Sequence, residues 1–133
     1  MKNNTLLDLI SDNFDYNVLN KKLNQIEGRR FVASVVRQQI VLNGHSMGYQ
    51  GDDLYCKWSA KLTYKNGEYV VKIHSDLYSK DRSGSTLYSS YDVEDSIDKQ
   101  VTLVDEQQLI DFLDNKALSR YFVREHDWTI YLV

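Results

Sequence analysis

The sequence predicts an α+β domain, in which an N-terminal helix precedes an antiparallel meander of four to five strands, followed by a C-terminal helix and a final strand. The helices are expected to pack on one face of the sheet. Three observations predict this class. Apolar residues recur at helical spacing near the N-terminus, Asn66-Gly67 separates two alternating runs, and a capping sequence beginning at Asp105 opens a second helical stripe.

The first predicted helix begins at Thr5, whose hydroxyl can cap it, and its apolar stripe continues to Ile26. Gly28 follows at a position where helices commonly end. Asp15 or Asn17 could begin a second helical segment, so one bent helix and two short helices are both open.

Residues 29–42 are rich in β-branched side chains and favour a strand. The adjacent pair Val35-Val36 breaks strict alternation, so a helix ending at Asn43-Gly44 is the alternative. The glycine-rich residues 43–51 are expected to connect two strands.

A hairpin over residues 56–78 is the clearest local feature. Asn66-Gly67 favours a type I′ turn, because both central residues of that turn need positive φ. This turn places Lys65 opposite Glu68 and every second residue on one face. The predicted apolar face, where the cysteine is expected to be a buried hydrophobe, comprises Cys56, Trp58, Ala60, Leu62, Tyr64, Tyr69, Val71, Ile73 and Leu77.

The last third predicts a strand at residues 86–91, a helix and a terminal strand. Asp105 is the expected N-cap, and Gln108 completes a capping box. The apolar stripe of this helix extends to Phe122. Residues 128–133 are predicted to form a short apolar strand. Residues 130–133 of this strand are a candidate sheet edge through which two copies of the protein could dimerise.

Length and composition suit one domain spanning residues 1–133. The chain has a net charge of -3, 42% hydrophobic residues and one cysteine. The apolar content argues against disorder, and no apolar run is long enough to cross a membrane. One cysteine cannot form an internal disulfide, so we expect a cytoplasmic protein.

Motifs for catalysis and for metal or phosphate binding are missing. The sequence has no Cys-x-x-Cys, no histidine pair at i, i+4, and no phosphate-binding glycine loop. His74 is expected beside Ser59 on a flat strand face, which does not supply the geometry of a nucleophilic triad. We therefore expect no catalytic residues, no metal site and no cofactor.

The charges are strongly polarised along the chain. Residues 92–114 contain eight acidic residues and one base, Lys99, for a net charge of -7. Residues 57–82 contain six bases and three acids, for a net charge of +3. Single-sign fields of this kind steer charged partners.

The leading functional expectation is a small acidic, non-catalytic protein-binding module that occludes the basic surface of a nucleic-acid-binding partner protein. Inhibitors, immunity proteins and phage anti-defence proteins act in this way. The ten tyrosines support an interface, since tyrosine is enriched there. The predicted partner-binding residues are Tyr88, Tyr91, Asp92, Glu94, Asp95 and Asp98.

Two other classes remain open. One is a nucleic-acid-binding domain that uses the lysine-rich face of the hairpin, including Lys57, Lys61 and Lys72. The acidic pI of about 5.5 argues against it. The other is a small-ligand binder or enzyme with a pocket between sheet and helices, lined by Trp58, Tyr64 and Trp128.

Overall fold

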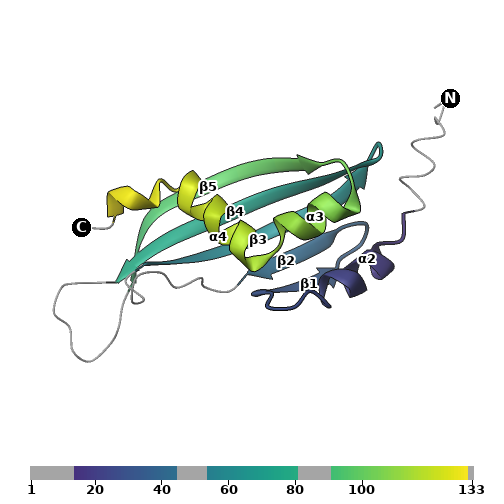
Figure 1. The fold of residues 1–133 in the computed structure, drawn as a ribbon, viewed down its shortest axis with the longest axis horizontal. Helices are drawn as coiled ribbons and strands as arrows, with labels where there is room; N and C mark the ends of the chain where they lie inside the picture. Colours follow the sequence, from purple (N-terminus) through teal and green to yellow (C-terminus); the bar gives the residue numbers. More distant parts are fainter. Residues whose placement is uncertain (1–13, 45–53, 81–90, 132–133) are drawn as a thin grey trace.

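The computed structural model describes residues 14–44, 54–80 and 91–131. Within them, one antiparallel sheet has the strand order β1-β2-β3-β4-β5 (Figure 1). Each strand pairs with its neighbour in sequence, so the predicted antiparallel meander is confirmed. The strands are β1 Phe31–Val35, β2 Ile40–Gly44, β3 Leu54–Lys65, β4 Glu68–Lys80 and β5 Tyr91–Leu103.

The first described helix, α2, spans Tyr16–Leu23. Asp15 caps it, because its carboxylate accepts hydrogen bonds from the backbone N–H groups of Asn17 and Val18 at 3.0 and 3.2 Å. A helical segment therefore begins at Asp15, one of the two starts that the sequence offered. The expected cap at Thr5 lies outside the described residues.

Residues 29–42 are not one strand, and the helical alternative is also wrong. They contain β1, a tight turn and most of β2, with Val35 opposite Ile40. The Val36 N–H donates to the Gln39 carbonyl at 2.9 Å, and Arg37 has a φ of 58°. Arg37 adopts the left-handed backbone conformation that closes this turn, at a position where glycine or asparagine is the usual residue.

The central hairpin is confirmed residue by residue. Lys65 pairs with Glu68, Trp58 with Ser75 and Cys56 with Leu77, as expected from a turn at Asn66-Gly67. Both turn residues have positive φ, 53° and 80°. The strong local turn signal therefore fixed the register between β3 and β4.

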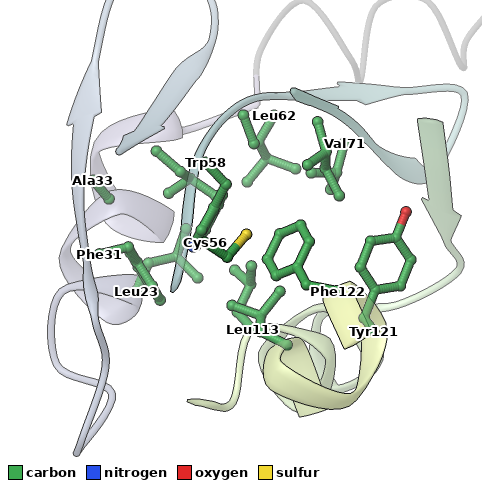
Figure 2. Packing of buried hydrophobic residues seen from close by; sticks show 14 of the residues in the cluster. Leu23, Phe31, Ala33, Cys56, Trp58, Leu62, Val71, Leu113, Tyr121 and Phe122 are labelled. Atoms are coloured by element: carbon green, nitrogen blue, oxygen red, sulfur yellow. The ribbon is translucent and has the colours of Figure 1, made fainter. Parts of the chain in front are cut away.

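One hydrophobic core joins the helices to a single face of the sheet (Figure 2). Burial alternates along β3, where Trp58 is buried and its neighbour Lys57 is exposed. From the helical side, Leu23 and Phe122 enter the same core, and the Phe122 and Trp58 ring centroids are 5.7 Å apart.

The strand expected at residues 86–91 lies mostly outside the described residues, and β5 occupies the acidic segment that follows it. Aspartate disfavours strands, but Ile97 and Val101 recur on the core side of β5 and pack against the core. Pairing with the long strand β4 overrides the weak local propensity.

The C-terminal third differs from expectation in two places. The predicted helix divides into α3, Glu106–Phe112, and α4, Asn115–Glu125, because Asp114 caps a new start. The expected final strand is wrong, since Trp128–Tyr131 forms a 3-10 helix. Trp128 is only 2% exposed and anchors this turn in the core. The edge proposed at residues 130–133 is therefore not a strand in its described part.

None of the helices in the described ranges has the length and apolar character that a membrane span requires.

Candidate functional site

The predicted acidic cluster lies on β5, an edge strand of the sheet, where its members separate. Asp95 pairs with core residue Leu77, whereas Asp98 pairs with His74 on the opposite face. The register shifts between Leu77 and Tyr78, and Glu94 is the extra residue in the resulting bulge. The cluster therefore does not form one continuous row of carboxylates.

Asp95 belongs to a polar chain that runs into the core. Its Oδ2 lies 2.8 Å from His126 Nδ1, and His126 Nε2 lies 2.8 Å from Ser75 Oγ. Ser75 Oγ in turn lies 2.8 Å from Cys56 Sγ. The His126 side chain has no exposed surface, so Asp95 supplies a partner that this buried ring needs.

The row of hydrogen-bonded side chains Asp95, His126 and Ser75 has the order of an acid–histidine–serine triad, but it lacks access to a substrate. Ser75 and Cys56 are both 0% exposed. Burial, the largest cause, raises the pKa of the Cys56 thiol to about 12, so the thiol stays protonated and unreactive. The expected buried cysteine is confirmed. These hydrogen bonds therefore hold the end of α4 against β4 and β5.

Sequence reasoning missed the role of His126. The available signal was Ser75, a polar residue that the hairpin register places opposite Trp58 on the apolar face. A buried hydroxyl requires a hydrogen-bond partner, but its partner lies 51 residues away in the chain.

Asp98 forms an exposed pair with His74. His74 Nδ1 lies 2.9 Å from Asp98 Oδ1, and His74 Nε2 lies 3.2 Å from Asp76 Oδ1. The Asp98 side chain is 81% exposed, so most of its surface remains free to meet a partner. The hydrogen bond that the His74 ring donates to the Asp98 carboxylate is the largest cause that raises the pKa of His74 above its usual 6.5.

We expect Asp98→Asn to lower the pKa of His74, because the amide cannot stabilise the imidazolium as a carboxylate does. A histidine pKa raised by folding stabilises the native state fully below about pH 6.5, and this contribution is lost as pH rises through the folded pKa. NMR titration of the His74 ring measures the shift directly. Asp111→Asn, at an exposed position on α3, is the control and should leave the pKa unchanged.

An aromatic patch lies on the same sheet face as His74. Tyr55 pairs with Tyr78, and their rings stack with centroids 4.9 Å apart and planes at 15°. Val93 pairs with Tyr78 and is 56% exposed. The patch of Tyr55, Tyr78 and Val93 provides apolar contact area near the acidic strand.

The other predicted site residues lie at or before the start of β5. Tyr91 and Asp92 begin β5, with backbone partners Lys80 and Ser79. Tyr88 lies outside the described residues. Glu94 is exposed and accepts a hydrogen bond from the Ser79 hydroxyl.

Across the described ranges, no three His, Cys, Asp or Glu side chains gather closely enough to hold a metal ion. Comparison of the chain with protein-family models, curated proteins and solved structures gave no match.

Proposed function

We propose that the chain is a non-catalytic protein-binding module that covers a basic surface of a partner protein in the cytoplasm. An inhibitor, an immunity protein or a phage anti-defence protein would act in this way. The observation that carries the proposal is the course of the acidic segment, which follows edge strand β5 and continues directly into α3.

The charge of this segment supports a cationic partner. Residues 92–114 hold eight of the 19 acidic residues of the chain and have a net charge of -7. Glu94 and Asp98 on β5 and Asp111 on α3 are exposed. Such a concentration of one sign speeds association with an oppositely charged surface and disfavours acidic partners.

The aromatic patch supports a protein rather than a simple cation as the partner. Two partly buried tyrosines and an exposed valine beside charged residues give the mixture of apolar contact and polar rim that protein interfaces use. Tyr55 and Tyr78 are already stacked, so little side-chain entropy is lost when a partner covers them.

Asp95 has a different role from the other predicted contact residues, since its carboxylate serves His126. The proposed contact set is therefore Glu94 and Asp98, with Tyr91 and Asp92 at the start of the same strand. Tyr88 remains in the set on its sequence position alone.

The decisive variant is Glu94→Lys/Asp98→Lys. We expect it to weaken binding to a captured basic partner at least tenfold, about 1.4 kcal/mol, because two attractive charges become repulsive. Affinity capture from a lysate identifies the partner, and calorimetry with the purified partner measures the Kd between 50 and 500 mM salt. Wild-type affinity should fall as salt rises.

The matched control is Glu27→Lys/Glu68→Lys, which makes the same charge change at exposed positions outside the acidic segment. The control should retain nearly all the affinity. If the control weakens binding equally, only net charge matters, and if no basic protein is captured the proposal fails.

A further inference from the structure

The sheet face opposite the helices carries a groove of about 610 Å³ over strands β2 to β5. Several of its polar lining residues alternate along their strands with buried residues such as Leu42 and Leu62. Its volume lies in the range of small-molecule sites. The polar lining residues are Asn43, Ser59, Lys61, Lys72, His74, Asp98, Lys99 and Gln100.

Lys61 and Lys72 lie directly opposite each other in the β3–β4 register, and both are exposed. Side chains in such a pair have Cβ atoms about 5 Å apart, and like charges there destabilise the sheet. Among the described residues, neither lysine has a carboxylate within ion-pair distance. An anion between the two ammonium groups would remove this repulsion.

The charge of the groove opposes that of the whole chain. On the groove face its lining contains two lysines, Lys61 and Lys72, and one aspartate, Asp98, a net of +1, because Lys99 pairs with buried Ile73 on the other side of β5; the chain as a whole carries -3. His74 adds a further positive charge when it is protonated. A positive groove on an acidic protein selects an anionic ligand that the rest of the surface repels.

The neutral lining residues indicate what else the ligand carries. Asn43, Ser59 and Gln100 offer amide and hydroxyl groups that bind hydroxyls, and Asp98 can accept from them. The lining contains no Phe, Tyr or Trp on which a nucleobase could stack. This composition favours a polyhydroxy compound over single-stranded nucleic acid.

We propose that this groove binds a small phosphorylated, hydroxyl-rich molecule, with the phosphate held between Lys61 and Lys72. The groove lining excludes the aromatic patch and Glu94 and shares only Asp98 with the proposed protein contact set, and the two lysines that would hold the phosphate are not in that set.

The test is an NMR titration of the ¹⁵N-labelled full chain with glucose 6-phosphate and, separately, with glucose. Glucose 6-phosphate should shift the amide signals of groove residues on β3 and β4 in a saturable manner, and glucose should not. Lys61→Gln/Lys72→Gln should raise the Kd at least tenfold. The same variant should keep or raise the thermal midpoint, because the like-charge pair is gone.

The control is Lys57→Gln/Lys65→Gln, which removes the same amount of charge from the same face of β3 as Lys61 but outside the groove lining. It should retain the wild-type Kd. Absence of saturable shifts with glucose 6-phosphate, or equal loss in the control, would overturn the proposal. Tighter binding of an eight-nucleotide oligo-dT than of glucose 6-phosphate would replace it with nucleic-acid binding.

The two proposals fail separately. Lys61→Gln/Lys72→Gln should leave capture of the protein partner intact, whereas Glu94→Lys, outside the groove lining, should weaken that capture and leave the Kd for glucose 6-phosphate unchanged.

Discussion

Gly44→Ala is expected to destabilise the fold by about 3 kcal/mol, the upper end of the usual cost of overpacking a core. A Cβ at residue 44 would lie 1.9 Å from Nε1 and 2.0 Å from Cε2 of Trp58. Trp58 is Gly44's register partner, is only 3% exposed, and packs between Phe31 and Phe122. The indole therefore has little room to withdraw. Urea unfolding measures the change.

Asn43→Ala is the control for this prediction, since Asn43 is the exposed neighbour on the same strand. It should change stability by no more than about 0.5 kcal/mol. Combining Gly44→Ala with Trp58→Leu should cost less than the sum of the two single changes, because the clash partner is then smaller. Equal stability of the Gly44→Ala and Asn43→Ala variants would show that the indole moves freely.

Asp95→Ala is expected to lower the free energy of unfolding by about 1–3 kcal/mol, the cost of leaving a buried polar group without its partner. The Nδ1 atom of His126 would lose the carboxylate 2.8 Å away, and no part of that side chain reaches solvent. Thermal and urea unfolding, followed by circular dichroism, provide the measurement.

Asp98→Ala supplies the comparison, because its carboxylate is 81% exposed and its partner His74 is half exposed. Its effect should remain within about 0.5 kcal/mol. Asp95→Ala/His126→Leu should be less destabilising than the sum of the single changes, since the orphaned ring is removed. If Asp95→Ala and Asp98→Ala lower the free energy of unfolding by the same amount, the contact between Asp95 and His126 contributes no more to stability than an exposed pair.

Features encoded by neighbouring residues were predictable from the sequence. Asn66-Gly67 and the alternation around it fixed every pair of the central hairpin. The start of α3 was equally local, with the Asp105 carboxylate accepting from the Gln108 N–H at 2.8 Å. In each case a few adjacent residues carry both the conformational preference and the hydrogen bonds that satisfy it.

Features set by distant contacts were not predictable in the same way. The turn at Arg37 has no glycine, and Trp128 reads as part of an apolar strand until its burial beside α4 is known. The division between Asp95 and Asp98 requires knowing that the acidic segment is a strand and which side of it meets His126. Tertiary packing decides these positions against local propensity.

The bulge at Glu94 makes the length of β5, and not only its composition, a determinant of the molecular surface. Val93 and Asp95 are two residues apart, yet their partners Tyr78 and Leu77 belong to opposite sides of the sheet. Deletion of Glu94 alone would make Val93 and Asp95 adjacent and leave both pairs in a regular ladder, whereas deletion of a residue between Asp95 and Leu103 would exchange solvent for core along part of the strand. Deletion of Glu94 should therefore be tolerated better than deletion of a residue from the regular part of β5.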